Sequence, residues 1–175
     1  SKHIKMMGDK IQAKKIAKKN GLPVIEDAAQ STGALYKGMV VGGIADINCF
    51  SFYPTKNLSC WGDAGAVTTN NDSLAEAITE MRNHGQSKRF KIERVGWNSR
   101  MDTIHAEVLC RKLVHLNKWN AKRKQIAQWY NDEFSDYVEV PYPNSHSLHV
   151  YHQYVIRSPR VLAIKDYLNK NDIQA

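Results

Sequence analysis

The chain has 175 residues, of which 42% are hydrophobic, and it carries a formal net charge of +8. This length suffices for one sizeable hydrophobic core and does not promise two independent domains. The excess positive charge lies along helical stretches such as Lys10–Lys19 and Lys112–Lys124. Because no aromatic platform accompanies these charges, we interpret the stretches as solvated helix faces and expect no nucleic-acid partner.

Cysteine usage and hydropathy narrow the cellular setting. The cysteines are far apart and form no CxxC pair, so neither a disulfide framework nor a metal site is predicted at Cys49, Cys60 or Cys110. No apolar run reaches the roughly 18 residues of a membrane span, and no signal-peptide pattern is present. We therefore expect a cytoplasmic protein without a membrane partner. The chain starts at Ser1 and stops in mid-pattern, and we expect both ends to be cut.

The first part of the chain has the pattern of a parallel α/β sheet. Apolar residues at helical spacing over Ile11–Asn20 end at Gly21, a common signal for the end of a helix. The apolar run Leu22–Ile25 follows and predicts a buried strand. A helix that enters a strand through a glycine turn is half of a parallel-sheet unit.

The middle of the chain continues this pattern. Strands are predicted at Ile47–Phe52 and Ala66–Thr69, on either side of the loop Tyr53–Gly65. Asp72 is an N-cap type of residue and opens a helix that runs through Met81 to Asn83–Gly85. The longest helical pattern, with an apolar stripe along it, covers Met101–Phe134.

A second, smaller α/β region is predicted within or after that long helix. Residues Val138–Pro141 and Tyr151–Ile156 alternate like strands, and Val161–Asn169 has helical spacing.

Three segments of the chain occur in a recognisable order. They are VIEDAAQ at 24–30, FSFYPTKNL at 50–58 and GWNSRMD at 96–102. Together they resemble the DegT/DnrJ/EryC1/StrS family of aminotransferases, which depend on pyridoxal 5'-phosphate (PLP) and act on nucleotide-linked keto sugars. The segments Gly62–Ala66 and Arg82–Gly85 extend the resemblance over essentially the whole chain.

The resemblance implies an α/β fold, the PLP-dependent transferase fold type I of the aspartate aminotransferase kind. Residues 1–115 would then form the C-terminal half of the large PLP-binding domain with its parallel sheet. Residues 116–175 would form the start of the small C-terminal domain, truncated here, because members of the family are considerably longer than this chain.

Asp27 is the candidate partner of the cofactor's ring nitrogen. It ends a predicted buried strand, and open α/β sheets bind ligands beyond the carboxyl ends of their strands. A carboxylate there would keep the pyridine nitrogen protonated, as PLP chemistry requires. The alternative is that Asp27 caps a following helix.

Lys56 is the candidate catalytic residue, because the resemblance implies that its amine holds PLP as a Schiff base and later carries a proton to the substrate carbon. Taken alone, a lysine in a loop is usually exposed to solvent. Ser51 matches the hydroxyl that binds the phosphate in the family, although Thr55 is chemically able to do the same.

Two further cofactor contacts are implied by the resemblance. Gln30 matches a residue beside the phenolic side of the cofactor, and the alternative is a surface glutamine. Asn98 matches a residue that reaches the phosphate from the neighbouring subunit, which implies a homodimer with shared active sites. The alternative for Asn98 is a turn residue after Gly96. Ser99 departs from the family pattern, which usually has an aromatic residue there.

The reaction implied is transfer of an amino group, from L-glutamate, to a keto carbon of a nucleotide-diphosphate sugar. Lys56 favours this reaction over dehydration, since relatives described as dehydratases have histidine in its place. An alternative is that the chain is a non-catalytic fragment or remnant of such an enzyme and acts only in assembly or binding.

Overall fold

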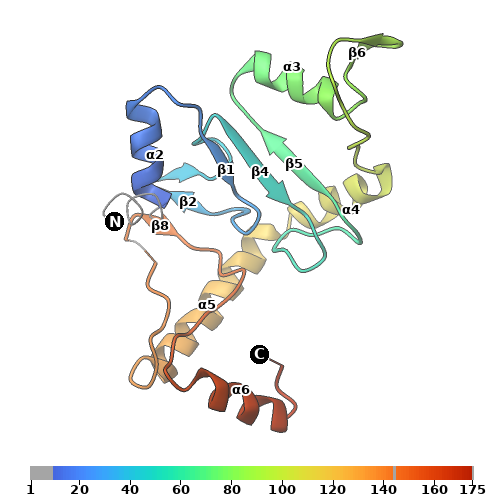
Figure 1. Ribbon diagram of the computed structural model, residues 1–175. Coiled ribbons are helices and arrows are strands. Elements are labelled where there is room, and N and C mark those ends of the chain that lie inside the picture. The colour runs from blue at the N-terminus through green and yellow to red at the C-terminus, as the bar shows by residue number, and fades with distance from the viewer. Residues whose placement is uncertain (1–9, 144, 175) are drawn as a thin grey trace.

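The computed structural model describes residues 10–143 and 145–174. A three-stranded sheet lies at its centre, in the order β1-β4-β5 (Figure 1). Strand β1 (Ile25–Asp27) runs parallel to β4 (Ile47–Ser51), and β5 (Gly65–Thr68) runs antiparallel to β4. Helix α2 (Lys10–Lys19) precedes β1, as the helical pattern predicted. The strand predicted at 22–25 is displaced toward the C-terminus in the structure, because β1 begins at Ile25 and ends at Asp27.

A second sheet joins an early segment of the chain to a late one. It has the order β3-β2-β8 and is antiparallel, with β2 at Leu35–Tyr36, β3 at Met39–Val40 and β8 at Ser147–Leu148. Figure 1 shows this sheet beside β1 and below α2. The C-terminal part of the chain therefore returns to the first part and pairs with it.

Helix α3 (Asp72–Met81) and a hairpin form the far side of the molecule. The N-cap of α3 is Asn71, one residue before the predicted Asp72, because the Asn71 side chain accepts the backbone N–H of Leu74 at 3.1 Å. The hairpin consists of β6 (Gln86–Lys88) and β7 (Lys91–Ile92) and projects from the body (Figure 1).

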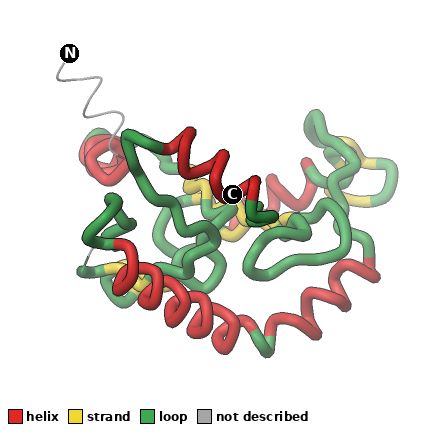
Figure 2. The backbone as a smooth tube through the Cα atoms, turned by 90° about the horizontal axis from the view of Figure 1, so that it is seen from below, coloured by secondary structure: helices red, strands yellow, loops and turns green. Residues whose placement is uncertain are grey.

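The predicted single helix over 101–134 is wrong, because it is divided in two. Helix α4 covers Thr103–Leu113 and α5 covers Leu116–Phe134. Figure 2 shows them following one another along one side of the molecule with a short loop between them. Leu109 and Leu116, on either side of the break, are buried, whereas Ile104 in the first turn of α4 is 60% exposed.

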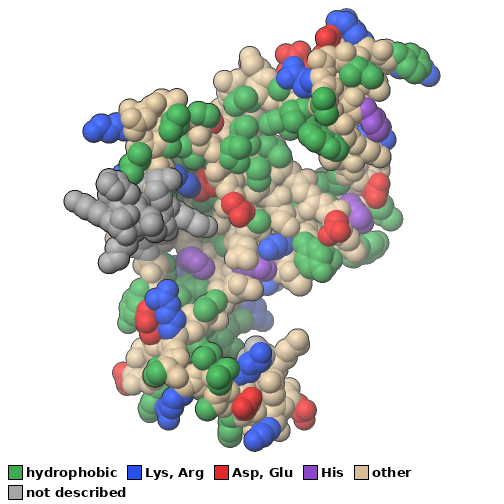
Figure 3. Space-filling view, viewed as in Figure 1, with side chains coloured by type: hydrophobic (Ala, Val, Ile, Leu, Met, Phe, Trp, Pro, Cys, Tyr) green, Lys and Arg blue, Asp and Glu red, His purple; other side chains and the backbone are tan. Residues whose placement is uncertain are grey.

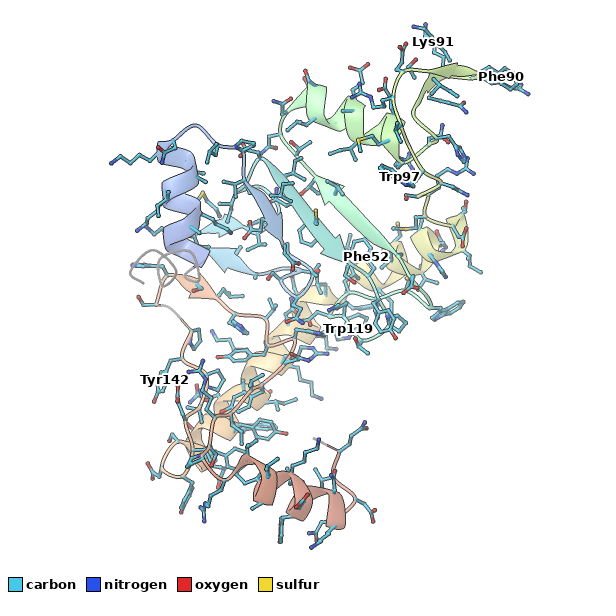
Figure 4. The ribbon with its side chains drawn as sticks, in the orientation of Figure 1. Phe52, Phe90, Lys91, Trp97, Trp119 and Tyr142 are labelled. Carbon is cyan, nitrogen blue, oxygen red and sulfur yellow. The ribbon has the colours of Figure 1, made fainter. Side chains whose placement is uncertain are left out.

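The hydrophobic core sits where α4 and α5 meet the loop after β4. Its buried members are Leu58, Cys60, Leu109 and Leu116, and Phe52 packs against them. In Figure 4 Phe52 lies at the centre of the molecule, between the end of the sheet and these helices. The core therefore supports the loop that contains Lys56.

The C-terminal part contains little regular sheet. The strands predicted at 138–141 and 151–156 are wrong as strands, because a single bridge between Glu139 and Arg157 is what the structure shows there. Helix α6 (Val161–Lys170) confirms the predicted C-terminal helix to within one residue. In the described part of the chain, none of the helices combines the length and apolar composition needed to cross a membrane.

Candidate active site

The site is built on the carboxyl ends of β1 and β4. Asp27 lies opposite Cys49 in the parallel pairing of these strands, and Ser51 follows two residues later on β4. Because side chains alternate between the faces of a sheet, Asp27, Cys49 and Ser51 share one face. The Asp27 Oδ1 accepts the backbone N–H of Ala29 at 3.0 Å. One carboxylate oxygen therefore closes the turn after β1. Residues 28–34 form turns rather than a helix, so Asp27 does not cap a following helix as the alternative supposed.

The loop after β4 is fixed by its own hydrogen bonds. The Tyr53 N–H donates to Ser51 Oγ at 3.3 Å, and the Lys56 N–H donates to the Tyr53 carbonyl at 2.9 Å. The Cys60 N–H then closes the loop onto the Phe52 carbonyl at 2.9 Å. These bonds place Lys56, which is partly buried, just beyond the strand end.

A hollow of about 580 Å³ opens beside this loop, and we call it the Lys56 hollow. It combines a primary amine, a guanidinium, hydroxyl groups and one carboxylate. Its lining residues are Ser51, Tyr53, Lys56, Asp63, Ala64, Gly65, Ser99, Arg100 and Met101. Charged and histidine side chains gather in the middle of the face seen in Figure 3. Two cations beside hydroxyl donors are suited to an anionic group such as a phosphate.

Asn98 lies outside the lining of the Lys56 hollow, next to Arg100. The Arg100 Nε donates to Asn98 Oδ1 at 3.1 Å, and one of its terminal nitrogens donates to Asn83 Oδ1 at 3.2 Å. Asn83 and Asn98 also form an antiparallel backbone bridge. Within one chain, Asn98 therefore helps to orient the Arg100 guanidinium.

Gln30 lies in a different hollow, of about 300 Å³, which we call the Gln30 hollow. It contains two histidine rings, and its lining residues are Gln30, Ser31, Pro141, His149, His152, Gln153 and Val155. Burial lowers the pKa of His152, and the positive charges of Lys56 and Arg123 lower it further. The two hollows have no lining residue in common. His152 Nδ1 is buried and has no hydrogen-bond partner within the described residues.

A buried pair of asparagines lies beneath the loop. The Asn57 Nδ2 donates to Asn120 Oδ1 at 2.8 Å and to the Val150 carbonyl at 2.9 Å. The Asn120 Nδ2 donates to the Thr32 carbonyl at 3.1 Å. We call these four partners the amide clamp. Sequence analysis missed Asn120 and His152, although Asn120 stands one helical turn after the buried Leu116, a position where α5 calls for an apolar residue.

The structure thus brings some of the predicted site residues together and separates others. Ser51 and Lys56 share the Lys56 hollow, and Asp27 lies on the neighbouring strand end. Gln30 and Asn98 do not line this hollow. Gln30 lines the Gln30 hollow, and Asn98 accepts a hydrogen bond from Arg100. Thr55, the alternative to Ser51, is exposed and is not among the lining residues. The roles of these side chains stay predictions.

Comparison with known proteins identifies the family. The model of the DegT/DnrJ/EryC1/StrS aminotransferase family matches residues 6–175. The chain is 40% identical over 162 residues to a pleiotropic regulatory protein of Geobacillus stearothermophilus, covering 90% of this chain and 44% of that protein. It is 43% identical over 143 residues to a UDP-2-acetamido-2-deoxy-3-oxo-D-glucuronate aminotransferase of Pseudomonas aeruginosa, covering 81% and 40%.

The structure of S. venezuelae DesV in complex with a ketimine intermediate has a TM-score of 0.90 to this chain at 35% identity, covering 95% of this chain and 45% of DesV. The chain therefore spans less than half the length of these proteins. The predicted fold class is confirmed, and so is the resemblance inferred from the three sequence segments. The chain belongs to the DegT/DnrJ/EryC1/StrS aminotransferase family.

Proposed function

We propose that this chain is the PLP-binding part of a nucleotide-sugar aminotransferase and that the Lys56 amine carries PLP covalently. The observation that carries the proposal is the Lys56 hollow itself. A partly buried primary amine, the Arg100 guanidinium and the Ser51 hydroxyl line one space at the end of the central sheet. Ligands of open α/β sheets bind at this edge.

The residues of the hollow fit PLP by their chemistry. An aldehyde needs a primary amine, which Lys56 supplies, and a phosphate needs hydroxyl and cationic donors, which Ser51 and Arg100 supply. A pyridine nitrogen needs a carboxylate, and Asp27 lies on the same sheet face as Ser51. Gln30 is not placed against this hollow in the single chain, and its contact with the cofactor is part of the proposal.

When bound, PLP supplies an electron sink that lets an amino group pass from a donor to a keto carbon. The Asp27 carboxylate holds a proton on the pyridine nitrogen, while Ser51 and Arg100 bind the phosphate. The Lys56 amine would be the base that moves a proton to and from the substrate carbon.

We further propose L-glutamate as the amino donor and a nucleotide-diphosphate keto sugar as the acceptor. The name of the P. aeruginosa relative, a UDP-sugar aminotransferase, supports the second of these. A homodimer with shared sites, in which Asn98 reaches the partner's phosphate, and the division of the chain at 115/116 belong to the same proposal. So does a cytoplasmic location.

A spectroscopic titration tests this function. PLP added to the chain gives an absorption band in the visible or near-ultraviolet range that L-glutamate then removes, since amino transfer changes the electronic structure of the cofactor. Lys56→Ala abolishes the band, whereas Lys118→Ala, a matched change of an exposed lysine on α5, leaves it in place. A band that persists in Lys56→Ala would contradict the proposal. A wild-type chain that binds no PLP would favour the non-catalytic alternative.

A further inference from the structure

We propose that Asn57 and Asn120 are positioning residues. Their amide clamp holds the loop that contains Lys56 in a fixed position relative to α5 and to the backbone at Thr32 and Val150. The inference rests on the proposed function for the role of Lys56, but the clamp has a readout of its own that needs no cofactor. It is carried by hydrogen bonds that join four separate segments of the chain.

The first step is what the clamp connects. Asn57 follows Lys56 directly, and its Nδ2 bonds both Asn120 on α5 and the Val150 carbonyl, two residues before His152. Asn120 in turn bonds the Thr32 carbonyl, two residues after Gln30. The lysine loop, α5 and two of the three backbone segments that line the Gln30 hollow therefore meet at one pair of side chains.

The second step is the burial of the pair. Asn57 is 8% and Asn120 6% exposed, and neither carries a charge. A buried amide is costly unless its hydrogen bonds are made, whereas apolar residues of similar volume fill such a space without that cost. The Asn57 Oδ1 even lacks a partner within the described residues. What an amide adds over a leucine is direction, because its bonds fix one arrangement of the four segments.

The third step is the close approach of α5 to the chain at Gly33. A Cβ built on Gly33 would lie 2.7 Å from Asn120 Nδ2, and Gly33 has a φ of +84°. A residue with a side chain would push α5 away from the Thr32 carbonyl. Arg123, one turn after Asn120, donates to the Tyr151 carbonyl at 3.2 Å. Side chains on the same face of α5 thus bond the backbone at Thr32 and at Tyr151, next to the residues that line the Gln30 hollow.

These contacts predict how Lys56 is held. The turn bond to Tyr53 fixes the loop on one side of the lysine, and the clamp fixes it on the other. Without the clamp Lys56 is still present, but its amine can shift relative to Asp27 and Ser51. Attachment of PLP, which needs all three groups at once, then weakens.

The test compares Asn57→Leu, Asn120→Asp and the double change Asn57→Leu/Asn120→Leu with the wild type. Asn117→Leu, an exposed asparagine on α5, is the matched control. Asn57→Leu removes the two hydrogen bonds that Asn57 Nδ2 donates, to Asn120 and to the Val150 carbonyl. We expect its PLP affinity at Lys56 to fall about tenfold. Asn120→Asp still accepts from Asn57 but places a carboxyl oxygen opposite the Thr32 carbonyl, so the tie to Thr32 is replaced by a repulsion and the affinity also falls. Asn117→Leu has no effect.

The double variant separates positioning from stability. Replacing both amides with leucine leaves no unpaired side-chain group, so we expect it to unfold at a temperature at least as high as Asn57→Leu. Its affinity for PLP at Lys56 nevertheless stays about tenfold below the wild type, because the direction given by the amides is absent. A double variant that binds PLP as tightly as the wild type would overturn the inference.

Amide hydrogen exchange without PLP gives the independent readout. The double variant Asn57→Leu/Asn120→Leu is expected to speed exchange together in three segments, 32–34, 56–60 and 150–152, since it removes every bond of the clamp. Faster exchange confined to the neighbours of residue 57 would overturn the clamp. If the wild type takes up no PLP, the proposed function fails, and this exchange pattern still decides the inference.

Discussion

Two side-chain contacts hold loops to helices in this molecule, and they differ in burial and in chemistry. At the centre, the neutral amides of Asn57 and Asn120 join the lysine loop to α5. At the hairpin, the Arg94 Nε donates to the buried Glu80 Oε2 at 2.5 Å and ties the chain after β7 to α3. The Asn57–Asn120 contact is almost free of solvent, whereas the Arg94 side chain is 45% exposed. Neutral groups hold the site, and a screened ion pair holds the projecting arm.

The two regions are expected to respond differently to substitution. The hairpin has a projecting tip, where Phe90 is 83% exposed and points away from the body beside Lys91 (Figure 4). Its base depends on a few close contacts with α3. The centre is instead fixed by bonds from several segments. We therefore expect changes at the hairpin base to act locally and changes at the centre to act on PLP binding.

The largest effect on stability is expected from Gly85→Ala at the hairpin base. Gly85 has a φ of +75°, and a Cβ there would collide with the Arg94 carbonyl oxygen. We expect the free energy of unfolding to fall by about 3 kcal/mol in urea titrations. Gly38→Ala is the control, since Gly38 has a φ of +76° but open space around it. It should cost about 1 kcal/mol, and equal losses in the two variants would show that the collision is relieved without cost.

A smaller effect is expected from Glu80→Gln. This change keeps the shape of the side chain and removes the ionic character of its bond to Arg94, so stability should fall by about 1 to 2 kcal/mol. Trypsin should cut faster after Lys88, Arg89 and Lys91, because the hairpin opens more often. PLP binding at Lys56 should not change. A loss of PLP binding in this variant would contradict the separation of the two regions.

Arg100→Gln tests the proposed contact between the Arg100 guanidinium and the phosphate of PLP. Loss of one cationic partner of the phosphate is expected to weaken PLP binding about tenfold, that is by ~1.4 kcal/mol. Binding of pyridoxal, which lacks the phosphate, should stay the same. Arg111→Gln on the exposed face of α4 is the control. Equal weakening for PLP and pyridoxal would mean that Arg100 does not contact the phosphate.

The smallest effect is a dependence of stability on pH. Burial lowers the pKa of both His149 and His152 below the ordinary value of 6.5. Between these lowered values and pH 6.5 the unfolded chain binds more protons than the folded chain, so stability decreases as pH falls from about 7 to 5. The His149 ring also accepts the backbone N–H of Tyr151 at 2.9 Å, a bond that protonation of Nδ1 would break.

Urea titrations at several pH values check this dependence. The variant His149→Gln should show a shallower decline, because one of the two neutral rings is gone. Stability that rises as pH falls through this range would contradict burial of the neutral rings.

Local sequence patterns predicted the parts of the fold that depend on neighbouring residues. Helix α2, strand β4 and the loop with Lys56 follow from periodicity and turn residues, and the site motif follows from short segments around Asp27 and Lys56. The break between α4 and α5 was missed because the apolar spacing of 101–134 continues across it. Periodicity records which residues are apolar, not where a helix changes direction.

Contacts between distant segments lay beyond the sequence. Asn57 and Asn120 are 63 residues apart, and neither residue type is unusual in a loop or on a helix. The pairing of β8 with β2 likewise joins residues 147–148 to residues 35–36. His152 was missed for the same reason, since it lines a hollow with Gln30 only after the C-terminal part folds back.

The most direct test of the central claim is to locate PLP on the chain. The purified chain is incubated with PLP, reduced with borohydride, digested and mapped by peptide mass spectrometry. We expect the pyridoxyl group on Lys56, and we expect free phosphate to compete with its attachment. Label spread over exposed lysines such as Lys37 and Lys118, with none concentrated on Lys56, would contradict it.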